Sequence, residues 1–222
     1  MKTMKKIDAV LFDLDGTLLD TALDFTDVVN QLLQEEHRAT MDYSQVRSAV
    51  SHGSVGLIET AFQLSSDDPG FDPLRQRLLD LYINALTNKT RLFPGLEALL
   101  NRLGEDDIPW GIVTNKPVLY TTPIIKGLGL KPAAVVCPDH VSNTKPHPES
   151  VYLACQHIGC QAENTVMIGD HLRDVEAGRN ANAITIAAAY GYLNADEDAS
   201  SWQANYIAHR SEDLLPILET LL

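Results

Sequence analysis

The sequence is short of basic residues. It has 17 lysine and arginine residues against 30 aspartate and glutamate residues, which gives a formal net charge of −13. Such a charge argues against nucleic acid or an anionic membrane as the main partner. An anionic ligand would therefore need a local positive site within an overall negative field. Internal repeats and low-complexity tracts are also missing.

Cysteine is scarce as well. The chain has three, Cys137, Cys155 and Cys160, and their spacing matches no metal-binding motif. An odd number of cysteines without such spacing is typical of unpaired thiols in a reducing compartment. The apolar run that follows the basic N-terminus stops at Asp13. We therefore expect neither a signal peptide nor a membrane span, and we expect a cytoplasmic protein.

What the chain does contain is a series of short apolar runs separated by segments with helical periodicity. This pattern predicts an α/β fold with a parallel sheet. With 222 residues, of which 45% are hydrophobic, the chain is long enough to bury a sizeable core. The predicted strands are Ala9–Phe12, Trp110–Val113, Ala134–Cys137, Val166–Ile168, Ile184–Ala187 and Tyr206–Ala208.

The segment between the first two predicted strands differs from the rest. From Thr21 to Leu86 the periodicity is helical and no strand is evident. Because this insertion is too long for a connection, we expect a small helical cap over the carboxyl edge of the sheet. We predict a core domain of residues 1–19 and 88–222 and a cap domain of residues 20–87. The predicted helix faces consist of Phe25, Val28, Val29, Leu32 and Leu33, and of Leu74, Leu78, Leu81, Tyr82 and Ala85.

Two carboxylates follow the first apolar run directly. Asp13 and Asp15 can point into one crevice, while Gly16 lets the backbone turn and offer its N–H to an anion. Two unpaired acids beside a buried strand repel each other, and a cation between them would relieve that repulsion. A solvated acidic turn is the simpler alternative. A calcium loop matches poorly, because its glycine is the sixth residue and Gly16 is the fourth.

Three further strand ends carry polar residues, and ligands of parallel sheets bind beyond the carboxyl ends of the strands. Each residue also has a purely structural explanation. Thr114 could cap a helix, Lys145 could be a solvated lysine, and Asp174 could face a helix dipole. Their occurrence at several strand ends favours a common site. The residues are Thr114, Asn115 and Lys116 after the second strand, Lys145 after the third, and Asp170 and Asp174 after the fourth.

These segments resemble the four motifs of the haloacid dehalogenase-like (HAD) hydrolase superfamily. DLDGT is similar to the first motif, Thr114 in TNKP to the second, Lys145 in TKPHP to the third, and GDHLRD to the fourth. The resemblance covers essentially the whole chain. It implies a Rossmann-like core of the HAD type with an inserted helical C1 cap, as in the phosphoglycolate phosphatase-like branch. WGIVTNKP, CPDHVSNTKPHPE and AYGYLNADEDASSW are similar to the N-acetylmuramic acid 6-phosphate phosphatases of that branch.

The resemblance implies a magnesium-dependent phosphatase acting on a small phosphate monoester, either N-acetylmuramic acid 6-phosphate or 2-phosphoglycolate. Asp13 would attack phosphorus, and Asp15 would protonate the leaving alcohol and then accept a proton from water. Magnesium would be held by Asp13, the backbone carbonyl of Asp15 and Asp170, with Asp174 orienting a bound water or Lys145. The phosphate would be held by Gly16, Thr114, Asn115 and Lys145.

The choice of substrate is expected to come from the predicted cap. His52, Gly53 and Ser54 offer polar groups and a turn between two helical stretches. His52 could instead be an ordinary helix-end residue. Lys116 has two possible interpretations: it contacts an anionic substrate, or it is an exposed lysine.

The resemblance leaves His171 without a role, because the family usually carries a smaller or acidic residue there. Tyr190 and Tyr192 follow the fifth predicted strand, and we expect them to pack in the core rather than to line the pocket. The partner is expected to be a small anionic phosphorylated metabolite. Monomer and homodimer are both open.

Two other functions share the same residues. A sugar phosphomutase would return the phosphate to a bound sugar, and a non-catalytic phospho-ligand sensor would bind without turnover. By family analogy, dehalogenases lack an acid at the position of Asp15, and phosphonate-cleaving members use a cap lysine. Residues 20–86 contain no lysine, so neither of these two chemistries is favoured.

Overall fold

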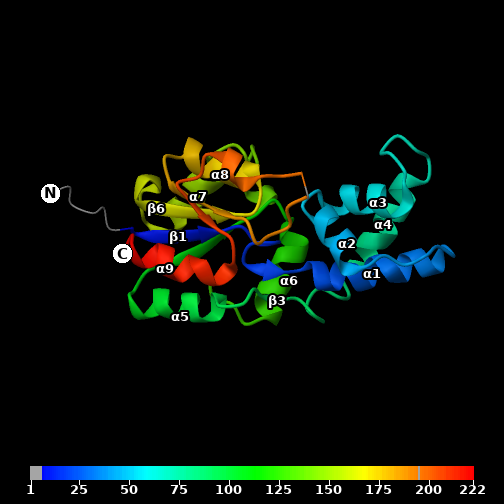
Figure 1. The fold of residues 1–222 in the computed structure, drawn as a ribbon, viewed down its shortest axis with the longest axis horizontal. Coiled ribbons are helices and arrows are strands. Elements are labelled where there is room, and N and C mark those ends of the chain that lie inside the picture. Colours follow the sequence, from blue (N-terminus) through cyan, green and yellow to red (C-terminus); the bar gives the residue numbers. More distant parts are fainter. Residues whose placement is uncertain (1–6, 195) are drawn as a thin grey trace. The chain divides into compact units, whose positions relative to one another are not determined.

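The computed structural model describes residues 7–194 and 196–222. These residues form two compact units, which we call the core unit and the helical unit (Figure 1). The core unit contains the chain up to Leu19 and from Leu92 to Leu222, and the helical unit contains Asp20–Arg91. The first six residues of the basic N-terminal stretch lie outside the described residues, as does residue 195.

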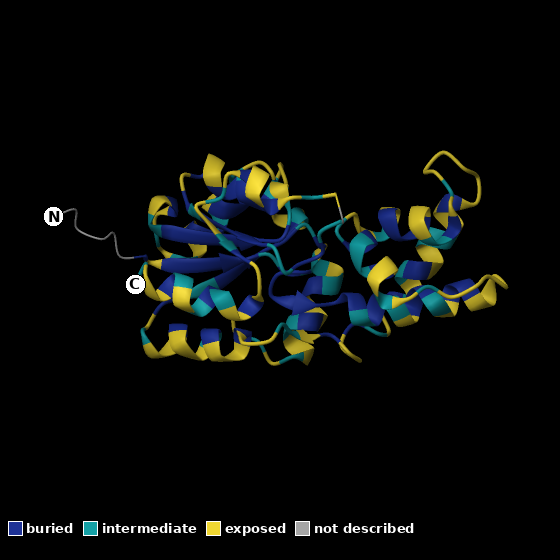
Figure 2. Ribbon diagram, in the orientation of Figure 1, coloured by how far each residue is buried: buried dark blue, intermediate teal, exposed yellow. Residues whose placement is uncertain are grey.

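A six-stranded parallel sheet with the order β5-β4-β1-β6-β7-β8 forms the centre of the core unit. All the predicted strands are present, which confirms the α/β class. The strands β1 and β6 are buried along their whole length, since they lie inside the sheet with helices on both faces (Figure 2). The sheet consists of β1 (Ala9–Phe12), β4 (Trp110–Val113), β5 (Ala134–Val136), β6 (Thr165–Gly169), β7 (Ile184–Ala188) and β8 (Tyr206–Ala208).

The register of the sheet brings neighbouring strands to an end at one edge. Phe12 pairs with Ile112 on one side and with Ile168 on the other, and Val113 pairs with Val136. The chain therefore leaves these strands at a common carboxyl edge, where ligands of parallel sheets bind. The first residues beyond this edge include Asp13, Thr114 and Asp170.

Helices of the core unit connect the strands and cover the sheet. Helix α8 begins next to Asp170, and a capping box fixes its start. Nδ1 of His171 accepts a hydrogen bond from the N–H of Arg173 at 3.1 Å, and Oδ2 of Asp174 accepts one from the N–H of His171 at 3.1 Å. His171 is therefore the N-cap of α8. The helices are α5 (Leu96–Glu105), α6 (Val118–Gly127), α7 (Glu149–Ile158), α8 (Leu172–Asn180) and α9 (Leu214–Glu219).

The helical unit consists of α1 (Ala22–Glu35), α2 (Tyr43–Val50), α3 (Gly53–Phe62) and α4 (Phe71–Tyr82). The predicted apolar face of α1 is buried, and Phe25 stacks on Tyr82 of α4 with ring centroids 3.8 Å apart. Ala85, predicted on the face of α4, lies beyond the end of that helix.

The paired two-residue strands β2 (Leu19–Asp20) and β3 (Arg91–Leu92) were not predicted, and they lie where the chain passes between the units. Two residues are too few to produce an alternating or apolar pattern. Over the described residues, no helix is both long and apolar enough to cross a membrane.

Candidate active site

The loop after β1 carries the two acids of the DLDGT segment at the carboxyl edge of the core sheet. The side chains of Asp13 and Asp15 are 14% and 20% exposed. Gly16 has φ +81°, and its N–H donates to the carbonyl of Leu19 at 3.0 Å. A Cβ at residue 16 would lie 2.1 Å from Oδ2 of Asp170. Only glycine therefore allows this loop to pass so close to Asp170.

Lys145 is a buried cation between two of the acids, with a side chain that is 1% exposed. Its Nζ lies 2.8 Å from Oδ1 of Asp13, 2.7 Å from Oδ1 of Asp174 and 2.7 Å from the carbonyl oxygen of Val113. Three acceptors match the three protons of an ammonium group. Burial lowers the pKa of Lys145, but Asp13 and Asp174 outweigh it and hold that pKa above its usual value. Lys145 is therefore not a solvated surface lysine.

Asp170 is only 4% exposed and is held by neutral donors. Oγ1 of Thr17 donates to its Oδ1 at 3.0 Å, and the N–H of Tyr192 donates to its Oδ2 at 2.8 Å. Burial, followed by the charges of Asp13 and Asp174, raises the pKa of Asp170 well above its ordinary value. A buried carboxylate among other carboxylates is an environment that a cation would relieve.

The arrangement of acids fits a divalent cation. Ligand oxygens of Asp13, Asp170 and Asp174 lie within 4.8 Å of one another, and carboxylate oxygens are the ligands that Mg²⁺ prefers. Asp174 also has contacts to the chain through both oxygens, since Oδ1 contacts Lys145 and Oδ2 accepts the hydrogen bond from the N–H of His171. Asp174 is therefore placed to orient neighbouring groups such as Lys145.

The charge of Asp13 depends on the cations around it. Burial raises the pKa of Asp13 to about 6, Lys145 opposes this effect, and the charge of Asp174 adds to it. A bound cation would act in the same direction as Lys145 and favour the ionised carboxylate. Asp13 can therefore serve as an oxygen nucleophile once positive charge is close by.

The segment after β4 contributes Thr114, Asn115 and Lys116 to the same edge. The N–H of Lys116 donates to Oγ1 of Thr114 at 3.1 Å, and Nδ2 of Asn115 donates to the carbonyl of Lys145 at 3.2 Å. Nζ of Lys116 contacts both carboxylate oxygens of Asp15, at 3.0 and 3.2 Å. The alternative that Lys116 is an exposed lysine is therefore wrong, since its side chain is 7% exposed.

The candidates from the predicted cap lie in the helical unit. His52 is exposed and precedes α3 as its N-cap residue without a side-chain capping bond. Gly53 has φ +64°. Oγ of Ser54 accepts a hydrogen bond from Nε of Arg75 at 2.8 Å. Within this unit, the three residues therefore form the start of one helix, and Arg75 joins them there.

Sequence reasoning missed the residues that hold Asp170. Thr17 was part of the quoted DLDGT segment, yet nothing in its type indicated a bond to a residue 153 positions away. Tyr190 and Tyr192 pack against Phe93, as their aromatic character predicts, with centroids 5.2 and 6.3 Å apart. In addition, the hydroxyl of Tyr190 donates to the carbonyl of Thr17 at 2.8 Å. Gly191, between the two tyrosines, was the signal in the sequence for this close packing. A Cβ at residue 191 would lie 2.1 Å from Cβ of Asp170.

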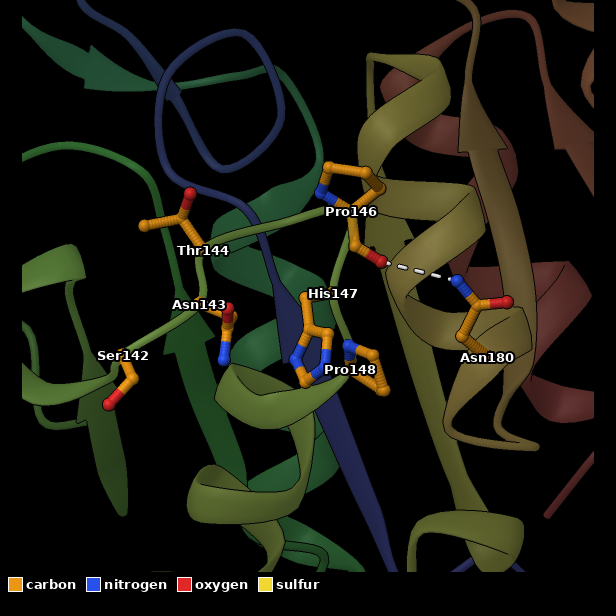
Figure 3. A pocket seen from close by; sticks show the side chains of 7 residues that line it. All are labelled: Ser142, Asn143, Thr144, Pro146, His147, Pro148 and Asn180. Carbon is orange, nitrogen blue, oxygen red and sulfur yellow. Dashed lines mark hydrogen bonds between the residues drawn. The ribbon is translucent and has the colours of Figure 1, made fainter.

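A surface cavity of about 540 Å³ lies beside the loop that carries Lys145 (Figure 3). Residues 142–144 and 146–148 line it together with Asn180, whose Nδ2 donates to the carbonyl of Pro146 at 3.3 Å. None of the candidate site residues lines this cavity. It is therefore separate from the cluster of acids and lysines.

Comparison with known proteins relates the chain to one family. The family model described as haloacid dehalogenase-like hydrolase matches residues 10–188. The chain is 39% identical to the N-acetylmuramic acid 6-phosphate phosphatase of Pseudomonas aeruginosa over 224 residues, which cover 100% of this chain and 99% of the relative. It is 38% identical to the phosphoglycolate phosphatase of Xanthomonas campestris pv. campestris, over 93% of this chain and 94% of that protein.

Solved structures share the fold. A protein from Haemophilus somnus, described as a predicted phosphoglycolate phosphatase, is 23% identical with a TM-score of 0.82, over 97% of this chain and 99% of that chain. CbbY from Rhodobacter sphaeroides in complex with phosphate is 20% identical with a TM-score of 0.71, over 94% of this chain and 96% of that chain. At these identities the likeness concerns the fold alone.

Proposed function

Since this chain belongs to the haloacid dehalogenase-like hydrolase family and is an enzyme of that family, we propose that it is a magnesium-dependent phosphatase. It hydrolyses a small phosphate monoester through an aspartyl-phosphate intermediate, an acyl phosphate on Asp13. The observation that carries this proposal is the buried Lys145 between Asp13 and Asp174, with Asp170 beside them at the same edge.

In the first step, Asp13 provides the nucleophile. One of its carboxylate oxygens forms a bond to phosphorus while the bond from phosphorus to the alcohol oxygen breaks. Asp15, two residues further along the same loop, gives a proton to the departing alcohol oxygen. Lys145 keeps the Asp13 carboxylate in place, because it contacts one of its oxygens at 2.8 Å.

In the second step, water cleaves the acyl phosphate on Asp13. Asp15, now a carboxylate, accepts a proton from the attacking water, so both groups return to their starting protonation states. The oxygen of water bonds to phosphorus and the bond to Asp13 breaks, which releases inorganic phosphate. The partial exposure of Asp15 supports this assignment, because both the alcohol and the water must reach it.

Magnesium would be held by Asp13, Asp170 and the backbone carbonyl of Asp15, and Asp174 would orient the groups around it. When bound, such an ion neutralises charge as the carboxylate approaches the phosphate dianion. The neutral donors on Asp170 support this assignment, because they aim its carboxylate while leaving its charge uncompensated.

The phosphate oxygens would be bound by the Thr114 hydroxyl and the Asn115 N–H, with Lys145 adding its positive charge. The Thr114 oxygen already accepts a hydrogen bond from Lys116, so its own proton can be donated to a phosphate. Gly16 would also bind the phosphate. To do so, its N–H would have to break its hydrogen bond to the carbonyl of Leu19.

We further propose that the helical unit serves as the cap and selects the substrate through His52, Gly53 and Ser54. N-acetylmuramic acid 6-phosphate is the first candidate substrate, because the relative named for it matches the whole chain. 2-Phosphoglycolate is the second, since a relative of similar identity is named for it. Both are small anionic phosphorylated metabolites.

Phosphate release by the purified protein, with each substrate and with added Mg²⁺, tests the proposal. We expect turnover that a chelator abolishes, and phosphate on residue 13 in acid-quenched samples analysed by mass spectrometry. No release from any ester would contradict the proposal. Transfer of phosphate between sugars without stoichiometric inorganic phosphate would identify a phosphomutase instead.

A further inference from the structure

Lys116 has no part in the two steps above, although it directly contacts the group that transfers protons. Its ammonium lies 3.0 and 3.2 Å from the two oxygens of Asp15, and its side chain is 7% exposed. Such a contact holds Asp15 by both oxygens. Asp15 must turn at least one oxygen toward the alcohol during the reaction, so this ion pair has to loosen when substrate binds.

The backbone of Lys116 is fixed, which confines any movement to its side chain. Its N–H donates to Thr114 at 3.1 Å, and its carbonyl accepts a hydrogen bond from Oγ1 of Thr121 at 3.1 Å. The residue sits just before α6, one position ahead of the N-cap Pro117. The four-carbon stem is therefore the flexible part, and the ammonium can change partners without a change in the loop.

A carboxylate on the substrate is the natural replacement for the carboxylate of Asp15. It has the same charge and geometry, so the buried ammonium keeps an equivalent ion pair when it leaves Asp15. The other lysine of the site is unsuited to this exchange, because Lys145 is already held by Asp13, Asp174 and the carbonyl of Val113. A chain with a net charge of −13 also needs a local cation to attract a second anionic group.

We propose that Lys116 determines specificity by passing from Asp15 to a carboxylate of the substrate, which frees Asp15 to face the leaving oxygen. Phosphate monoesters whose alcohol carries a carboxylate are then preferred over neutral analogues. This inference rests on the proposed phosphatase function. It names the substrate class and the residue that recognises it.

Two matched pairs of substrates test the exchange. The first is 2-phosphoglycolate and 2-hydroxyethyl phosphate, and the second is N-acetylmuramic acid 6-phosphate and N-acetylglucosamine 6-phosphate. The measured quantity is the ratio of kcat/KM for the carboxylate to kcat/KM for the neutral partner, in whichever pair contains the faster substrate. Lys116→Met removes the charge and keeps the length of the side chain, and Lys126→Met removes an exposed charge from α6 as the control.

In the wild type and in Lys126→Met we expect a ratio of about 10 to 100, as for a charge-assisted hydrogen bond. In Lys116→Met the ratio should fall to about 1, mainly through the carboxylated substrate. If Lys116→Met does not fold, Lys116→Gln still donates to Asp15 without a charge and should show the same loss of preference. The folding of each variant is checked by circular dichroism.

The two levels of the proposal fail in different ways. If the wild type hydrolyses none of the four esters, the phosphatase function itself is wrong. If it hydrolyses them without preference for carboxylates, or if Lys116→Met slows both members of a pair equally, the exchange is wrong and Lys116 serves Asp15 alone.

Discussion

The candidate site residues of the core unit and those of the helical unit are held in different ways. In the core unit, the important contacts join distant parts of the chain: Lys145 and Asp13 are 132 positions apart. In the helical unit, Ser54 and Arg75 are 21 positions apart, and His52 is exposed. If the proposed roles are right, catalysis depends on the tertiary structure of the sheet edge, and recognition depends on the start of one helix. Substitutions in the two units should therefore have effects of very different size.

The largest effect is expected for Asp13→Asn in the core unit. An amide cannot form the acyl-phosphate intermediate, so kcat should fall by at least about 10⁴-fold, as when a catalytic nucleophile is removed. Phosphate release under saturating substrate and Mg²⁺ measures it, and circular dichroism should show an unchanged fold. A variant that keeps more than a few per cent of wild-type kcat would contradict the role of Asp13.

The next largest effect is expected for Asp170→Asn, which should separate activity from stability. Loss of this carboxylate should lower kcat/KM by about 10²–10³-fold, comparable to removal of a group that stabilises charge in the transition state. The same change should stabilise the metal-free protein at neutral pH, because burial and the charges of Asp13 and Asp174 disfavour the ionised form of Asp170. Each kcal/mol of relief corresponds to about 2–4 °C in Tm.

The stability gain expected for Asp170→Asn should depend on pH, because the pKa of Asp170 is raised in the folded protein. A carboxyl whose pKa is raised in the folded state costs stability when pH is above that pKa, and the cost disappears as pH falls toward the ordinary value of 3.8. Thermal melting in the presence of a chelator should therefore show the gain at neutral pH and a much smaller gain near about pH 4. Asp67→Asn, at an exposed position of the helical unit, is the control and should show neither effect.

A moderate effect is expected for His52→Ala in the helical unit. If the start of α3 contacts the substrate, kcat/KM should change by about ten-fold or less, and by different factors for N-acetylmuramic acid 6-phosphate and 2-phosphoglycolate. Turnover of a generic aryl phosphate should change little. Glu59→Ala, on the exposed side of the same helix, provides the comparison. Equal losses on all three substrates would argue against a role in recognition.

The smallest effect on activity is expected for Tyr43→Phe. Its hydroxyl donates to both oxygens of Asp20, at 3.0 and 2.9 Å. Loss of this bond should cost about 1–2 kcal/mol and lower Tm by about 2–6 °C. Hydrolysis of an aryl phosphate at room temperature should be unchanged. A drop in kcat/KM similar to that of Asp170→Asn would contradict a purely structural role for this hydrogen bond.

Much of the core fold is predictable from the sequence, for a physical reason. The inner strands β1, β4 and β6 are almost fully buried, so each appears as an apolar run, and the residue after the run lies at the ligand-binding edge. The sequence could therefore identify three candidate site residues by their positions after strands: Asp13, Thr114 and Asp170. The strands β2 and β3 are only two residues long and gave no such pattern.

The partners of the site residues were beyond sequence reasoning. Nothing in the sequence joins Lys116 to Asp15, which lies 101 positions earlier, or Tyr192 to Asp170. Such contacts depend on side-chain directions that are set only when the sheet and its loops pack together. His171 illustrates the same limit, because its use as a helix cap depends on the local backbone at the start of α8.

Gly16 and Gly191 flank Asp170 so closely that a Cβ at either residue would lie 2.1 Å from an Asp170 atom, far inside van der Waals contact. Saturation mutagenesis should therefore find both positions intolerant of every replacement, including alanine. Substitutions that change the activity of this fold are therefore expected mainly at other positions, for instance at residue 116 or in α3. We expect both glycines to be retained in natural and engineered variants of the protein.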